Sequence, residues 1–130
     1  MKQGDTFTHS FVVSERTYNT FIELFEDRNP LHTDSSVAAT HGFRDKVMHG
    51  NILNGFISFF VGECLPEKNV IIHSQQISYS KPVYMNDNLQ FSAEISGVHE
   101  SVNAIEFRFS FQNQDNVKVA SGKIQIGVLK

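Results

Sequence analysis

The sequence predicts an α+β domain in which an antiparallel β-sheet wraps around a central buried α-helix. Three observations support this fold class. Near residue 69 the spacing of apolar residues changes from helical to alternating, residues 50–64 are apolar on nearly every side of a helix, and four alternating segments follow. With 130 residues, the chain is expected to form one domain, residues 1–130, because two smaller cores would barely offset the entropy of the chain.

The first elements of the chain are a strand and a helix. Residues Thr6–Val13 alternate between apolar and polar side chains, which predicts a short strand. Ser14 follows in the position of an N-cap, and the next apolar residues have the i, i+3, i+4, i+7 spacing of an amphipathic helix. These residues are Tyr18, Phe21, Ile22 and Phe25. Pro30 predicts that the helix has ended and that a turn follows.

Two further helices are expected before residue 69. Asp34 can cap a short helix through Thr40, which Gly42 would close. The segment Gly50–Cys64 carries apolar residues on nearly every side, which predicts a helix buried all round, and Pro66 stops it.

The second half of the chain supplies the sheet that would cover this helix. Alternating apolar residues and short polar connections predict four antiparallel strands. The strands are Val70–Ser80, Leu89–Val98, Val102–Gln112 and Val117–Leu129. The twelve phenylalanines are expected to form mainly the core between the sheet and the helix.

Composition excludes several classes of protein. The net charge is -3 and no cluster of basic residues occurs, so neither a nucleic-acid partner nor an anionic membrane surface is expected. Cys64 is the only cysteine, which excludes an intrachain disulfide and favours a reducing compartment. The first residues lack the apolar region of a signal peptide, and a cytoplasmic location is expected.

The turn between Asp27 and His32 is the segment with the chemistry of a catalytic site. A carboxylate and an imidazole together suit acid–base work on a water molecule. Pro30 restricts the backbone between them, and Asn29 can hydrogen-bond within the turn. The alternative interpretation is an ordinary surface turn after a helix.

The dipeptide His49-Gly50 opens the predicted buried helix. The free N–H groups of a helix start can stabilise negative charge on a carbonyl oxygen, and Gly50 would let a carbonyl approach the backbone closely. Alternatively, Gly50 only eases the chain into a crowded core, with His49 packed beside it. The histidines lack the spacing of a zinc site, no nucleotide-binding glycine loop occurs, and no metal or cofactor is expected.

These segments resemble the MaoC-like (R)-specific enoyl-CoA hydratases. The resemblance covers roughly residues 5 to 98. It rests on six runs: Asp27-Arg28-Asn29-Pro30-Leu31-His32-Thr33-Asp34, Ala38-Ala39, Gly42-Phe43, Val47-Met48-His49-Gly50, Ser80-Lys81-Pro82-Val83 and Asn86-Asp87. It implies a hot-dog fold, usually a homodimer, and an enzyme that hydrates trans-2-enoyl-CoA or dehydrates (R)-3-hydroxyacyl thioesters.

The resemblance also implies roles for individual residues. Asp27 and His32 would be catalytic, and the N–H of Gly50 would bind the carbonyl oxygen. The substrate would contact five further residues: Asn29, His49, Ser58, Phe56 and Phe59. The sequence departs from the family at Glu26 and Asn86, where a glycine often stands before the aspartate.

Several functions remain open at this point. The substrate could be bound to acyl carrier protein instead of CoA, and a thioesterase on the same fold is a weaker alternative. A non-catalytic acyl-binding or partner subunit is the rival from another class, and Glu26 favours it because two adjacent carboxylates repel each other.

Overall fold

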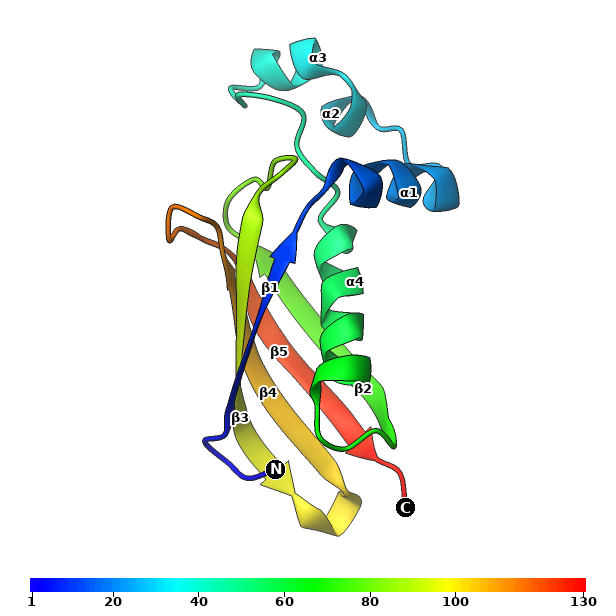
Figure 1. Ribbon diagram of the computed structural model, residues 1–130, viewed down its shortest axis with the longest axis vertical. Helices are drawn as coiled ribbons and strands as arrows, with labels where there is room; N and C mark the ends of the chain where they lie inside the picture. The colour runs from blue at the N-terminus through cyan, green and yellow to red at the C-terminus, as the bar shows by residue number, and fades with distance from the viewer.

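Five strands form one antiparallel sheet in the order β1-β3-β4-β5-β2, and the helices lie against it or beyond its end (Figure 1). The computed structural model describes all residues, 1–130. The strands are β1 (Thr6–Val12), β2 (Val70–Tyr79), β3 (Asn88–His99), β4 (Ala104–Gln112) and β5 (Lys118–Val128). A short 3-10 turn, Glu100–Val102, precedes β4, so this strand begins later than the alternation at Val102 predicts.

The helices before β2 follow the predicted order. They are α1 (Glu15–Phe25), α2 (Pro30–Thr33), α3 (Ser35–Thr40) and α4 (Asn51–Phe59), with a π-helical turn at Phe60–Cys64. Ser14 caps α1 by accepting a hydrogen bond from the N–H of Thr17, and Asp34 caps α3 as predicted. The short helix α2 replaces the predicted irregular turn because Pro30 occupies its first position, where no N–H is needed.

The core lies between the sheet and one face of α4. Phe91, Phe107 and Phe111 of the sheet are fully buried. The ring of Phe60, at the end of α4, lies 4.7 Å from that of Phe91 and 5.7 Å from that of Phe107. Six phenylalanines are buried and Phe7, Phe21 and Phe56 pack against the core, which confirms that most of the twelve belong to it, although Phe25 is 67% exposed.

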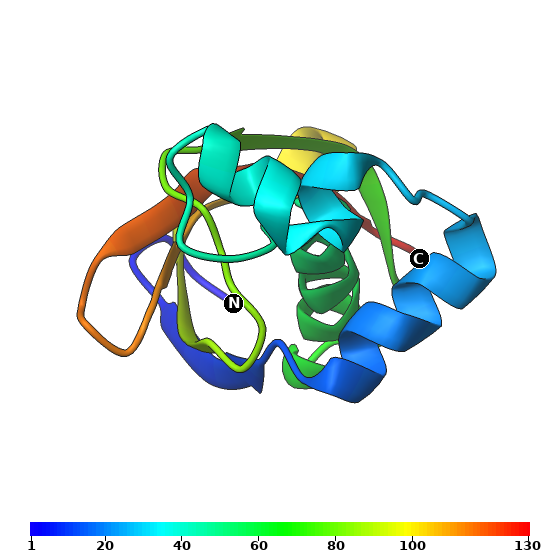
Figure 2. The ribbon, with the colours of Figure 1, turned by 90° about the horizontal axis from the view of Figure 1, so that it is seen from above.

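One expectation about the helices is wrong in detail. The helix α4 is not buried all round: Ile52, Leu53 and Ile57 are buried, whereas Gly55 and Ser58 are exposed. A single sheet covers only one side of a helix, and the other side of α4 stays open in the single chain. Seen from above, α4 lies between the curved sheet and α1 (Figure 2).

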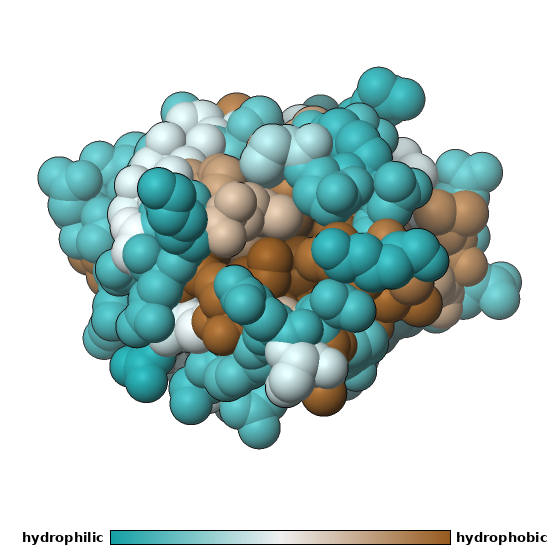
Figure 3. All heavy atoms as spheres, turned by 90° about the horizontal axis from the view of Figure 1, so that it is seen from below, coloured by the Kyte–Doolittle hydropathy of each residue, from teal (hydrophilic) through white to brown (hydrophobic).

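The helices α1, α2 and α3 gather at one end of the sheet, over the N-terminal end of α4 (Figure 1). The opposite end of the molecule shows apolar side chains at its centre, surrounded by hydrophilic ones (Figure 3). No helix is long and apolar enough to cross a membrane. The end that carries α1–α3 holds the residues that the sequence predicts to be catalytic.

Candidate active site

The loop after α1 holds Asp27 in place through backbone hydrogen bonds. The N–H of Asn29 donates to Oδ1 of Asp27 over 3.1 Å, and Oδ1 of Asn29 in turn accepts from the N–H of Leu31. Asn29 is therefore the N-cap of α2. Asp27 itself is exposed, with its carboxylate accessible from outside.

The two positions where the sequence departs from the family pattern both have left-handed backbone. Glu26 has φ 58° at the C-cap of α1, and Asn86 has φ 70°. Glycine adopts such angles without steric strain. Residues with a Cβ are destabilised there, asparagine less than most. The geometry explains why a glycine suits these positions, and it places a small strain directly before Asp27.

His32 lies in α2 and is tied to the loop that precedes α4. Its Nδ1 lies 2.7 Å from the carbonyl oxygen of Val47, and its own carbonyl accepts a 2.6 Å hydrogen bond from the hydroxyl of Tyr18. A carbonyl can only accept, so Nδ1 carries the proton. In the neutral ring Nε2 is then the nitrogen that can accept a proton.

His49 is buried, with 2% of its surface exposed. Its Nε2 donates to the carbonyl oxygen of Asp27 over 2.8 Å, while its Nδ1 is buried without a partner. Burial lowers the pKa of His49, the neighbouring His32 lowers it further, and the contact with the carbonyl of Asp27 raises it. These observations favour a neutral imidazole at His49, whose hydrogen bond holds the backbone of Asp27 in place.

Gly50 precedes the first residue of α4, and its N–H finds no hydrogen-bond acceptor within the protein. Its φ of -59° is ordinary for any residue, so the need for glycine is spatial. A Cβ at this position would meet the ring of Tyr79 at 2.8 Å. The donor at the helix start is therefore free, with an aromatic ring closely packed beside it.

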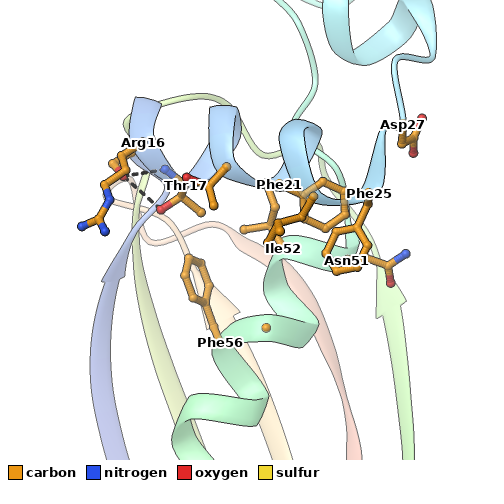
Figure 4. Close-up of a pocket in the computed structure, with 12 residues that line it drawn as sticks. Arg16, Thr17, Phe21, Phe25, Asp27, Asn51, Ile52 and Phe56 are labelled. Carbon is orange, nitrogen blue, oxygen red and sulfur yellow. Dashed lines mark hydrogen bonds between the residues drawn. The ribbon is translucent and has the colours of Figure 1, made fainter.

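Two adjoining pockets flank this set of residues, and Asn51 lines both. The larger pocket, of about 830 Å³, lies between α1 and α4 and has Asp27 at one end (Figure 4). Its apolar lining consists of Phe21, Leu24, Phe25, Ile52 and Phe56, beside the bare backbone of Gly55. The smaller pocket, of about 530 Å³, is lined by His32, Gly50, Tyr79 and Lys81, among others.

Asp27, His32 and His49 each bring a nitrogen or oxygen within 4.8 Å of the others. Three such groups can ligate a metal ion. The rings of His32 and His49, however, each commit one nitrogen to a backbone carbonyl. The remaining nitrogen of His49 is buried. The arrangement suits proton transfer at His32 and Asp27 better than metal binding.

The predicted site residues divide into those that the structure gathers and those that it separates. Asp27, His32 and Gly50 come together, and Phe56 lines the larger pocket. Four predicted substrate contacts lie outside both pockets: Asn29, His49, Ser58 and Phe59. Ser58 is exposed on α4, and the exposed position of α4 that does line the larger pocket is Gly55.

Sequence reasoning missed Tyr79, Asn51 and Asn54. The spacing of Asn51 and Asn54, three residues apart at a helix start, puts both amides on one helix face and could have drawn attention. Tyr79 offered no such signal, because its contact with Gly50 depends on how β2 crosses α4.

The comparisons with known proteins agree with this geometry. A family model described as a MaoC-like domain matches residues 2–116. An (R)-specific enoyl-CoA hydratase of Aeromonas caviae is 36% identical over 80 residues, which cover 62% of this chain and 60% of that protein. A mitochondrial 3-hydroxyacyl-[acyl-carrier-protein] dehydratase of Arabidopsis thaliana is 25% identical over 126 residues, which cover 95% of this chain and 75% of that protein.

Among solved structures, the (R)-hydratase from Aeromonas caviae involved in PHA biosynthesis superposes with a TM-score of 0.90 at 26% identity. The superposition covers 99% of this chain and 98% of that one. The predicted hot-dog fold, with its sheet wrapped around a helix, is confirmed by this likeness and by the strand order.

Proposed function

Because the chain belongs to the MaoC-like domain family, we propose that it is an acyl-thioester hydratase or dehydratase. The reaction is the addition of water to a trans-2-enoyl-CoA, giving the (R)-3-hydroxyacyl-CoA, or the reverse elimination. One observation carries this proposal: the proton-accepting Nε2 of His32 and the unpartnered N–H of Gly50 belong to residues that line one pocket, with Asp27 beside them.

In the proposed reaction, the N–H of Gly50 binds the thioester carbonyl oxygen. This hydrogen bond and the positive end of α4 draw electrons from the double bond, which makes the β-carbon electrophilic. Nε2 of His32 takes a proton from a water molecule as the water oxygen bonds to the β-carbon. The carboxylate of Asp27 holds the second hydrogen of that water.

The proton that Nε2 of His32 took from the water then passes to the α-carbon, so His32 returns to its neutral form and one molecule of water is added with no net proton consumed. His49 does not take part in this exchange, because it is buried behind Asp27 and holds the backbone carbonyl of that residue. Its proposed role is positioning.

The two pockets suit the two ends of a thioester. The apolar pocket between α1 and α4 fits the acyl chain, with Phe21, Phe25 and Phe56 in its wall. The smaller pocket includes Lys81, whose charge suits the phosphates of CoA or the acidic surface of a carrier protein.

The test is hydration of crotonyl-CoA, followed by the loss of enoyl absorbance. Asp27→Asn and His32→Ala are each expected to lower kcat by about 100- to 10,000-fold, the usual contribution of a general acid or base. The matched controls Asp34→Asn and His41→Ala change exposed residues outside both pockets and are expected to keep the wild-type rate. Wild-type rates in Asp27→Asn and His32→Ala would contradict the assignment.

A dehydratase acting on substrates bound to acyl carrier protein is the second candidate, favoured by the similarity to the Arabidopsis thaliana dehydratase. Comparing kcat/KM for the CoA and carrier-protein thioesters of one acyl chain separates the two. Saturable binding of enoyl-CoA without turnover at any chain length would instead support a non-catalytic acyl-binding subunit.

The proposal includes a homodimer, the assembly that the family resemblance implies. The open face of α4 carries Phe59, which is 45% exposed, and a second subunit would cover such a surface. Sedimentation equilibrium distinguishes a dimer from the single chain.

A further inference from the structure

Tyr79 lies beside the proposed position of the thioester carbonyl. It is the last residue of β2, and it lines the same pocket as His32 and Gly50. A Cβ placed on Gly50 would be 2.8 Å from the tyrosine ring and 3.2 Å from its hydroxyl oxygen. The hydroxyl therefore borders the space in front of the helix start.

Hydrogen bonds between three amide side chains orient the amide of Asn54 toward this hydroxyl. Nε2 of Gln75 donates to Oδ1 of Asn54 over 2.6 Å. Nδ2 of Asn54 donates to Oδ1 of Asn51 over 2.8 Å and to the hydroxyl oxygen of Tyr79 over 3.5 Å. Because Asn54 supplies the proton in the last contact, the oxygen of Tyr79 is an acceptor there.

The proton of the Tyr79 hydroxyl is left without a partner in the protein. Tyr79 is 50% exposed; the partial burial of its side chain raises its pKa, and the contact with Asn54 lowers it by a smaller amount. The hydroxyl therefore stays protonated at neutral pH. An uncommitted O–H donor and the uncommitted N–H of Gly50 thus belong to two residues in close contact that line the same pocket.

We propose, on the basis of the function proposed above, that the Tyr79 hydroxyl donates a second hydrogen bond to the thioester carbonyl oxygen bound at Gly50. Tyr79 is then a catalytic residue, and Asn54 and Gln75 are positioning residues that orient it. The second donor stabilises the charge that gathers on the carbonyl oxygen in the transition state more than it stabilises the neutral substrate.

The first test is the kinetics of Tyr79→Phe, which removes only the hydroxyl. We expect kcat for crotonyl-CoA to fall by about 10- to 100-fold, with KM changed little, because the lost hydrogen bond acts mainly in the transition state. Tyr84→Phe is the matched control, since Tyr84 lines neither pocket and stacks beneath Arg44. A Tyr79→Phe enzyme with kcat within twofold of wild type would overturn the proposal.

The second test separates orientation from mere packing. Asn54→Ala is expected to lower kcat less than Tyr79→Phe, and the double variant is expected to be no slower than Tyr79→Phe alone. Such non-additivity indicates that Asn54 acts through the hydroxyl. Fully additive losses in kcat, with all variants folded by circular dichroism, would contradict the positioning role.

The third test does not depend on turnover. Butyryl-CoA lacks the double bond and cannot be hydrated, and its carbonyl carbon can be labelled with carbon-13. Infrared difference spectra of the bound compound are expected to show a higher carbonyl frequency in Tyr79→Phe than in wild type, because a donor has been lost. This shift would support the inference even if the chain failed to hydrate enoyl-CoA, and equal frequencies would overturn it even in an active enzyme.

Discussion

The imidazole rings of His32 and His49 lie against each other, with their centroids 4.0 Å apart and their planes inclined by 31°. Each ring donates to a different backbone carbonyl, that of Val47 for His32 and that of Asp27 for His49. Two positive charges at this distance would repel each other strongly in a partly buried site. The neighbouring His32 therefore helps to lower the pKa of His49, and a carboxylate oxygen of the exposed Asp27 lies within 4.8 Å of a nitrogen of each ring.

This arrangement predicts a specific pH dependence of stability. Burial holds the pKa of His49 below the ordinary value of about 6.5. The unfolded chain therefore binds a proton that the folded chain does not as the pH falls below that value. The sign follows from linkage: the free energy of unfolding decreases with falling pH through this window.

The measurement is the melting temperature of wild type and His49→Gln between pH 7.5 and 5. Wild type is expected to lose more stability toward pH 5 than the variant, because glutamine does not titrate. His41→Gln, which changes an exposed histidine, is expected to follow wild type. If the melting temperatures of wild type and His49→Gln fell in parallel, His49 would not be the cause of the stability lost toward pH 5.

A second prediction concerns the close packing of Gly50 against Tyr79. Gly50→Ala places a Cβ 2.8 Å from the tyrosine ring, and such overpacking is expected to cost roughly 1–3 kcal/mol. In the Tyr79→Ala background the same change should cost nothing, since the ring is gone. Chemical denaturation of the four proteins measures this coupling, and an equal cost in both backgrounds would refute it.

A third prediction follows from the left-handed backbone at Glu26. Because its φ is 58°, Glu26→Gly is expected to raise the free energy of unfolding by about 1 kcal/mol, which corresponds to a melting temperature roughly 3 °C higher. Glu23→Gly makes the same change inside α1, where glycine should instead cost about 1 kcal/mol. A loss of stability in Glu26→Gly would show that the strain is absent.

A fourth prediction concerns the length of the acyl chain. No atom lies within 4 Å of a Cβ built on Gly55, so Gly55→Leu can project into the larger pocket without a clash. We expect the variant to keep most of its rate on crotonyl-CoA and to lose it on longer enoyl-CoA substrates. The control is Ser58→Leu, one turn further along α4 and outside both pockets, which should leave the chain-length profile unchanged. If Ser58→Leu instead lost activity on the longer substrates, the acyl chain would bind beside Ser58 and not in the larger pocket.

Much of the fold and part of the site could be predicted from the sequence because their signals are local. The caps at Ser14 and Asp34 and the alternation in the later strands are set by neighbouring residues, and all are confirmed. The same holds for the closeness of Asp27 and His32, which a proline-containing turn separates by only a few residues.

The remainder depends on contacts between distant segments. The burial of His49 comes from its packing against Phe21 of α1, with ring centroids 4.6 Å apart. The approach of Tyr79 to Gly50 depends on the register of β2, which shifts between Ile72 and Ser74. Neither the packing nor the bulge leaves a pattern in the residues alone. The open face of α4 was missed for a similar reason: its apolar residues do not indicate which of them the single chain covers.

The position of β4 and β5 in the sequence has a consequence for the evolution of the active site. These strands supply much of the buried core, including Phe107, Phe111 and Ile124, yet neither site pocket includes any of their residues. All residues lining those pockets fall between Ser14 and Val83. Substitutions in the first two thirds of the sequence can therefore change the active site during evolution. The last third, which holds β4 and β5, can meanwhile keep the residues that the core needs to fold.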